Sequence, residues 1–303
     1  MKVLAFAAVL LLSAPAALSS QELKDAFDGL SQAATGKDVP LILKSANEVF
    51  ALAKTTLETA APEGADEKAA WQVRIDYAKS IQTQAEYALV TFALQAPAAD
   101  QIQVFAALEA ASPKSQYLDG IYSQYFLALN QTGASNRIVP IAEKALANFP
   151  ENEDLLLLLT DDALNRKQLD RALSLANRLS AVMVRHPKPP GLSAADWDKK
   201  KATCLSHAYW TAGVVSGEKQ QWVNADKNLR AALPLIQGNN AMLAPAYYYL
   251  GVANYSLGRM TNSKAKILEG ASFSEKSAAI QGTLQQQAWR NAQAMKTEAG
   301  KMR

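Results

Sequence analysis

The chain has 303 residues, of which 49% are hydrophobic and 19% charged, and its formal net charge is +3. So small a charge argues against the strong basic field by which proteins attract nucleic acid or anionic membranes. Two histidines and one cysteine provide few ligands for a transition metal and exclude an intramolecular disulfide. We therefore expect no cofactor, no metal and no nucleic acid partner, and a fold stabilised by packing.

The first residues have the composition of an export signal. One lysine precedes an apolar run over residues 3–12, and small residues follow it. The run is shorter than the ~20 residues that span a bilayer, which is typical of a secretory signal peptide. The small residues leave cleavage open after Ala16 or after Ser19. We predict a signal peptide over residues 1–20, a periplasmic or secreted location, and no integral membrane span.

The remainder of the chain has the periodicity of helices. Apolar residues recur at intervals of three or four, without the alternation of strands. The clearest stripe comprises Trp71, Ile75, Ala78, Ile81, Ala85, Leu89 and Phe92. Glycines and prolines interrupt the pattern at Gly36, Pro62, Gly64, Pro97, Pro113, Gly133, Pro150, Pro187, Gly191, Gly217 and Gly258. The sequence therefore predicts an all-α fold of roughly 12- to 25-residue helices joined as antiparallel pairs.

Residues 21–114 have this helical texture without a recognisable repeat. We expect either diverged repeats or a separate helical region there. An enzyme with an unrecognised site in this region is the least favoured alternative, and Asp76 and Glu86 are weak candidates for such a site. Further along, Ser193 and Asp196 have the spacing of a capping box, which predicts a helix start after the proline-rich segment.

Residues 247–271 carry a pattern of large and small residues at fixed spacing. The large residue, the two Leu-Gly pairs, the aromatic and the small residues are Tyr247, Leu250, Gly251, Tyr255, Leu257, Gly258, Ser263 and Gly270. This segment resembles one complete tetratricopeptide repeat, with a Leu-Gly turn between its two helices. Small residues such as Gly251 and Gly270 allow two helices to approach closely.

Three further units agree with this pattern less well. They comprise Tyr122, Phe126, Gly133, Ala145 and Pro150; Leu156, Leu159, Ala163, Ala172 and Ala176; and Tyr209, Ala212, Gly213, Trp222, Ala225, Leu229 and Ala232. Ile138 and Ala172 are equivalent and are separated by the family's repeat length of about 34. We predict repeats over residues 115–273 and a polar capping helix over 274–303. The resemblance implies a right-handed α-solenoid.

The histidines and the cysteine do not form a catalytic constellation in the sequence. His186 and His207 lack a carboxylate at a recognisable spacing, and a catalytic histidine needs supporting groups. Cys204 lies three residues before His207, but a lone cysteine is more often a small buried apolar residue. We therefore predict no catalytic residue and no enzyme activity.

The resemblance implies that the first helix of each pair lines a groove that holds a partner. On the register above, the groove residues are Asp161, Asn165, His207, Trp210, Tyr248 and Tyr255. The alternative is that these side chains pack between helices. We predict a non-catalytic scaffold of the cell envelope or secreted space that binds a protein or peptide. A structural envelope-assembly protein that self-associates into a homo-oligomer is the second hypothesis.

Overall fold

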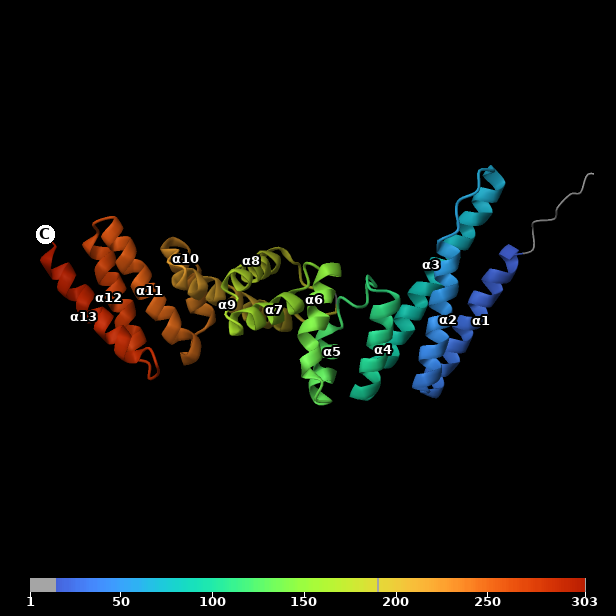
Figure 1. Cartoon of the computed structure of the whole chain (residues 1–303), viewed down its shortest axis with the longest axis horizontal. Helices are drawn as coiled ribbons and strands as arrows, with labels where there is room; N and C mark the ends of the chain where they lie inside the picture. Colours follow the sequence, from blue (N-terminus) through green and yellow to red (C-terminus); the bar gives the residue numbers. More distant parts are fainter. Residues whose placement is uncertain (1–14, 190, 303) are drawn as a thin grey trace, which may run out of the picture. The chain divides into compact units, whose positions relative to one another are not determined.

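The fold is all-α, as predicted. The computed structural model describes residues 15–189 and 191–302, and every regular element in them is an α-helix or a short 3-10 helix (Figure 1). Most of the predicted signal peptide, residues 1–14, lies outside the described part. In the described part, no helix is both long enough and apolar enough to cross a membrane.

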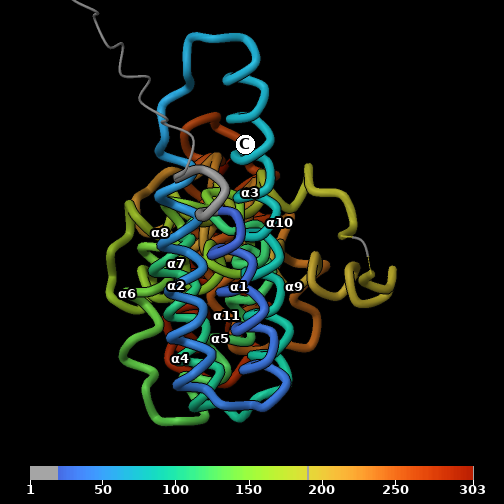
Figure 2. The backbone as a smooth tube through the Cα atoms, turned by 90° about the vertical axis from the view of Figure 1, so that its right-hand side faces the viewer, coloured from blue at the N-terminus to red at the C-terminus, as the bar shows by residue number. Residues whose placement is uncertain are grey.

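The chain divides into two compact units, Met1–Ile138 and Val139–Arg303. The helices of the first are α1 (Pro15–Gly36), α2 (Val39–Leu57), α3 (Ala65–Ala93), α4 (Ala98–Ala111) and α5 (Tyr122–Gln131). Helix α2 packs on α1, α3 and α4, and α3 also packs on α1 and α4. Figure 2 shows α1, α2 and α3 as neighbouring helices.

The predicted stripe of α3 accounts for its packing. Its middle residues, Ile75, Ala78, Ile81, Ala85 and Leu89, are buried. Trp71 and Phe92, at the two ends of the stripe, are half-buried. Helix α2 begins shortly after the predicted break at Gly36. The side chain of its N-cap residue, Asp38, accepts a hydrogen bond from the backbone N–H of Leu41 at 3.0 Å.

The second unit also consists of packed helices. Its helices are α6 (Ile138–Asn148, which begins at the boundary), α7 (Glu153–Asn165), α8 (Leu169–Arg185), α9 (Ala194–Glu218), α10 (Trp222–Ala232), α11 (Asn240–Met260), α12 (Lys264–Ala278) and α13 (Gln285–Lys301). From α7 onward each helix packs on the next, and α7, α9, α11 and α13 also pack in succession. The segment expected to be one capping helix, residues 274–303, is divided between the end of α12 and α13.

The helix start predicted from Ser193 and Asp196 is confirmed, with Ser193 as the N-cap of α9. The backbone N–H of Asp196 donates to Ser193 Oγ at 3.1 Å, and Ser193 Oγ donates to Asp196 Oδ2 at 2.6 Å. The polar side chain at this position stabilises the first turn, whose N–H groups have no partner within the helix.

One turn recurs five times in the part of the chain that the structure describes. Its central residue has a left-handed backbone, and the residues concerned are Lys37, Gly133, Lys167, Gln220 and Asn262, with φ of 57°, 76°, 57°, 58° and 50°. In each turn this residue donates its N–H to the carbonyl three residues back, and the next residue donates to the carbonyl five residues back. This pattern of bonds closes helices and reverses the chain.

Burial repeats in register with the turns. Buried residues lie four positions before each turn residue, at Ala33, Leu129, Ala163, Ser216 and Gly258, and five positions after it, at Ile42, Ile138, Ala172, Ala225 and Ile267. Gly133 and Lys167 are 34 positions apart. Ile138 and Ala172 therefore occupy equivalent positions, each five residues after its turn residue. The connection between α1 and α2 has the same local pattern of turn and burial.

Two predicted helix breaks are wrong. Gly217 and Gly258 are buried inside α9 and α11, and the chain reverses at Gln220 and Asn262 instead. A Cβ on Gly217 would lie 2.5 Å from the Tyr249 ring, and one on Gly258 would lie 2.8 Å from Ile267 Cγ1. These glycines are required for close packing, so the turn of the last unit lies one helical turn later than the Leu-Gly pair predicts.

Candidate binding groove

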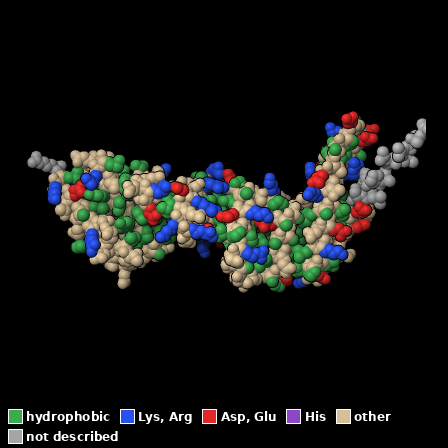
Figure 3. Space-filling view, in the orientation of Figure 1, with side chains coloured by type: hydrophobic (Ala, Val, Ile, Leu, Met, Phe, Trp, Pro, Cys, Tyr) green, Lys and Arg blue, Asp and Glu red, His purple; other side chains and the backbone are tan. Residues whose placement is uncertain are grey.

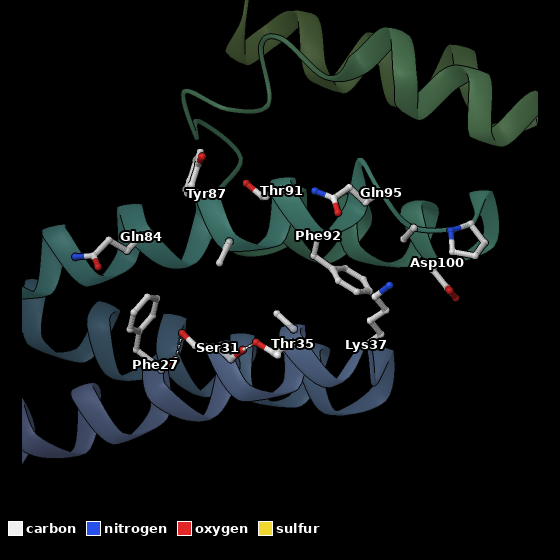
Figure 4. Close-up of a pocket in the computed structure, with 14 residues that line it drawn as sticks. Phe27, Ser31, Thr35, Lys37, Gln84, Tyr87, Thr91, Phe92, Gln95 and Asp100 are labelled. Carbon is white, nitrogen blue, oxygen red and sulfur yellow. Dashed lines mark hydrogen bonds between the residues drawn. The ribbon is translucent and has the colours of Figure 1, made fainter.

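An open groove of about 700 Å³ lies between α1 and α3 in the first unit (Figure 4). Its walls comprise Phe27, Ser31, Ala34 and Thr35 of α1 and Gln84, Tyr87, Ala88, Thr91 and Phe92 of α3. Because these residues recur at intervals of three or four, each helix presents one stripe to the groove. Lys37, Gln95, Ala96, Pro97 and Asp100 complete the lining.

The two hydroxyls of the α1 wall are oriented by their own helix. Ser31 Oγ donates to the carbonyl of Phe27 at 3.0 Å, and Thr35 Oγ1 donates to the carbonyl of Ser31 at 2.9 Å. Each hydroxyl therefore donates its hydrogen bond within the helix, and its oxygen lone pairs can accept hydrogen bonds from the groove.

The α3 wall contributes an aromatic ring and amides. The Tyr87 side chain is 58% exposed, and its ring centroid lies 5.7 Å from that of Tyr117. Gln84 donates one side-chain N–H to Ser80 Oγ at 3.1 Å, which leaves a second N–H and a carbonyl oxygen. Figure 4 shows Gln84, Tyr87 and Thr91 along α3, with Gln95 just beyond the end of that helix, opposite Phe27, Ser31 and Thr35.

A buried carboxylate anchors the segment that carries Tyr117. Glu86 is 6% exposed and accepts hydrogen bonds from Ser112 Oγ at 2.5 Å, Ser115 Oγ at 2.8 Å and Gln82 Nε2 at 3.1 Å. Buried carboxylates need such donors because they have lost their water. Glu86, a weak catalytic candidate in the sequence, thus joins α3 to the connection between α4 and α5.

The predicted groove residues lie in the second unit, and two of them are in contact. His207 Nδ1 of α9 lies 3.2 Å from Asp161 Oδ1 of α7. The hydrogen bond to Asp161 raises the pKa of His207, and burial opposes this increase. Asn165, at the end of α7, is exposed. His207 and Asp161 thus link the first helices of two successive pairs.

Two of the three aromatic residues of this prediction contact neighbouring helices, and the third contacts a ring of its own helix. Trp210 Nε1 donates to the carbonyl of Met242 at 2.8 Å, joining α9 to α11. Tyr255 donates its hydroxyl to Glu298 Oε2 at 2.6 Å, joining α11 to α13. The Tyr248 ring lies edge-on to that of Tyr249 at 5.2 Å. All three predicted aromatics are half-buried, so each has a packing role in addition to any contact with a partner.

Cys204 is buried, in agreement with the structural interpretation of its sequence. Burial raises the pKa of its thiol to about 12. A thiol of this kind is neutral at physiological pH and is a poor nucleophile. Among the described residues, no group of three or more His, Cys, Asp or Glu side chains is arranged to hold a metal ion.

The sequence did not predict the groove between α1 and α3. Its polar residues, Ser31 and Thr35 on α1, Gln84 and Thr91 on α3 and Gln95 just after α3, recur at helical spacing, as the residues of an ordinary solvent-exposed helix face do. The sequence signal that could have indicated a binding groove is the pair of phenylalanines, Phe27 and Phe92, because each adjoins one of these polar stripes. Figure 3 shows acidic, basic and apolar side chains interspersed over the face in view.

The fold and the groove define a class, an all-helical protein in which neighbouring helices pack on one another and an open groove lies between α1 and α3. No protein-family model matches the chain, and no curated protein has a significantly similar sequence.

Proposed function

We propose that this protein is a non-catalytic scaffold that holds a segment of a partner protein. In this proposal the helix pairs are tetratricopeptide-like and stack as a right-handed α-solenoid, and the partner lies on the first helices of the pairs. The recurring left-handed turn and its register of buried residues support the repeat. The apolar run at residues 3–12 supports an exported, periplasmic or secreted location.

The groove between α1 and α3 carries the proposal. Both helices are the first of a sequential pair, and a volume of about 700 Å³ accommodates several side chains of a ligand. Half-buried Phe27 and Phe92 and the exposed Tyr87 offer the aromatic surface that is enriched at protein interfaces. A rim of hydroxyls and amides adds hydrogen-bonding groups that orient a ligand.

Photo-crosslinking tests this function directly. A photoreactive residue replaces Thr35 in the groove or, as a control, Thr55 on α2, in cells that naturally produce the chain. Both threonines are exposed and bond to the carbonyl four residues back at 2.9 Å, so the substitutions are matched. We expect a protein adduct from position 35 that is absent from position 55. The adduct should disappear when Ala88→Leu fills the groove.

Either of two results would contradict the scaffold function. One is equal adducts at both positions, and the other is an adduct at position 35 that the Ala88→Leu variant retains. Circular dichroism and thermal melting must first show that each variant is folded. Mass spectrometry of the adduct then identifies the partner.

An exposed tryptophan favours the second candidate, self-association in an envelope assembly. Trp289 on α13 is 57% exposed, and tryptophans are frequent anchors of interfaces. Self-association through this helix predicts a mass that rises with concentration in analytical ultracentrifugation. Trp289→Gln would then restore the monomer mass, whereas a monomer at all concentrations excludes this candidate.

A further inference from the structure

The charge of the groove restricts its ligand. Its charged side chains are Lys37 and Asp100, which lie together at one end (Figure 4). Along the remaining length the lining consists of hydroxyl, amide, aromatic and alanine side chains. A ligand charged along its length would lose water without gaining an opposite charge, so the groove favours an uncharged ligand.

The hydrogen-bonding groups of the two walls differ. Ser31 and Thr35 are acceptors toward the groove because their protons are bonded within α1. Gln84 offers both a donor and an acceptor from α3. A ligand that satisfies both walls carries N–H donors and carbonyl acceptors along its length, and an extended polypeptide backbone has both.

The spacing of these groups matches an extended chain. Ser31 and Thr35 are four residues apart, a rise of about 6 Å along a helix, and alternate residues of a strand are about 6.6 Å apart. Gln84 and Phe92, the outermost lining residues of α3, are eight positions apart, a span of about 12 Å and the length of about four extended residues. A helical ligand would not fit this chemistry, because its backbone N–H groups bond within the helix.

Small residues leave room for alternate side chains of the ligand. Ala34 and Ala88 line the groove together with the rings of Phe27 and Phe92. In an extended segment, every second side chain points to the same face. Apolar side chains at those positions would cover the alanines and rings, and the residues between them would face solvent.

We infer that the groove between α1 and α3 binds an extended, uncharged polypeptide segment with apolar side chains at alternate positions, the pattern of a half-buried β-strand. This inference rests on the proposed function and specifies the chemical class of the partner segment. The strand-like pattern distinguishes it from an amphipathic helix and from a segment recognised by its charge.

Calorimetric titration of the full chain with synthetic peptides tests the inference. The probe is an acetylated and amidated peptide of about seven residues in which Val or Leu alternates with Thr, a length that covers the groove. One comparison peptide groups the apolar residues at helical spacing, and another carries N-methyl groups on alternate amides. We expect both comparison peptides to bind at least about tenfold more weakly, because they lose the pattern or the N–H donors.

Variants of the chain locate the binding. Ala88→Leu should weaken binding of the alternating peptide at least about tenfold, because it fills the groove. Thr35→Val should weaken it by about threefold to tenfold, the effect of one lost hydrogen bond. Thr55→Val, the matched substitution on α2, should leave the affinity unchanged. Melting curves of the three variants establish that each is folded.

The outcomes separate this inference from the function on which it rests. Absence of alternating-peptide binding overturns the ligand class, as does equal binding of either comparison peptide. Binding of a neutral glucose oligosaccharide in place of the peptides would overturn it too. If the Thr35 crosslink is nevertheless specific, the scaffold function stands with a different ligand. If that crosslink also fails, both proposals fall.

Discussion

Gly251 and Gly270 bring the backbones of α11 and α12 into contact. A Cβ on Gly270 would lie 2.7 Å from the carbonyl oxygen of Gly251 and 2.8 Å from the backbone nitrogen of Tyr255. A Cβ on Gly251 would lie 3.0 Å from the carbonyl oxygen of Gly270. Backbone atoms cannot rotate away as a side chain can, so either methyl group would push the helices apart.

Gly270→Ala should therefore lower the free energy of unfolding, by about 1–3 kcal/mol as for other overpacked cores. Gly300→Ala is the control, because Gly300 lies in α13 with nothing within 4 Å of a Cβ. It should raise stability by up to about 1 kcal/mol through helix propensity. Urea denaturation followed by tryptophan fluorescence reports mainly the second unit, which contains Trp197, Trp210, Trp222 and Trp289. Equal effects of the two substitutions would contradict the backbone contact.

The same glycines show what the sequence can predict of the fold. The spacing of Gly251 and Gly270 correctly predicted a close approach of two helices. The sequence predicts a turn at Gly258 and not a packing contact, because glycine occurs both in left-handed turns and in tight packing, and sequence alone does not distinguish these uses. The true turn is at Asn262, a residue type that also tolerates a left-handed backbone.

The candidate groove could not be predicted from the sequence for a different reason. Ser31 and Thr91 lie on helices separated by α2, and their common groove depends on how α1 and α3 pack. Asp161 and His207 were both predicted on the binding face, but their contact joins residues 46 positions apart. Periodicity assigns a residue to a face of its own helix, whereas such relationships arise only in the packed structure.

The recurring turns predict where glycine should stabilise the protein. Lys167 has φ of 57°, a conformation that costs a residue with a Cβ about 1 kcal/mol or more. Lys167→Gly should raise the free energy of unfolding by up to about 1 kcal/mol, offset in part by the entropy of glycine in the unfolded chain. Gly133→Ala, at the equivalent turn, should lower it by about 1 kcal/mol. Chemical denaturation that gave the opposite signs would contradict this account of the turn.

Cys204 should be unreactive in the folded protein. Its pKa is raised to about 12 by burial, from an ordinary value of 9.0, so at pH 8 the thiol is neutral as well as inaccessible. An aromatic disulfide reagent should modify it only after unfolding in urea. Rapid modification of the native chain would show that this part of α9 opens readily.

The same shift predicts a loss of stability in alkali. The folded state keeps the Cys204 thiol protonated while the unfolded chain ionises it, so its contribution is complete below pH 9.0 and is lost as the pH rises from there toward about 12. Cys204→Ala removes this contribution and is the control for other groups that titrate in the range. The stability of the variant should therefore fall less steeply above pH 9.0 than that of the native chain.

Asp161 should control the titration of His207. The hydrogen bond between them favours the imidazolium ion and raises its pKa above the ordinary value of 6.5, whereas burial alone would lower it. Asp161→Asn should therefore lower the pKa of His207, as measured by NMR titration of the imidazole ring. An unchanged pKa of His207 would refute the link between α7 and α9.

The hydrogen bond between Asp161 and His207 also determines the direction in which pH changes the free energy of unfolding. Because the folded-state pKa of His207 is raised, the stabilisation is complete below about pH 6.5 and is lost as the pH rises through the folded-state value. The two side chains are 37% and 43% exposed, so solvent screening keeps the effect under about 1 kcal/mol. The difference in unfolding free energy between the native chain and Asp161→Asn should consequently be largest in mild acid. A difference that grew toward alkaline pH would mean that His207 is stabilised as the neutral ring, and that Asp161 does not favour its charge.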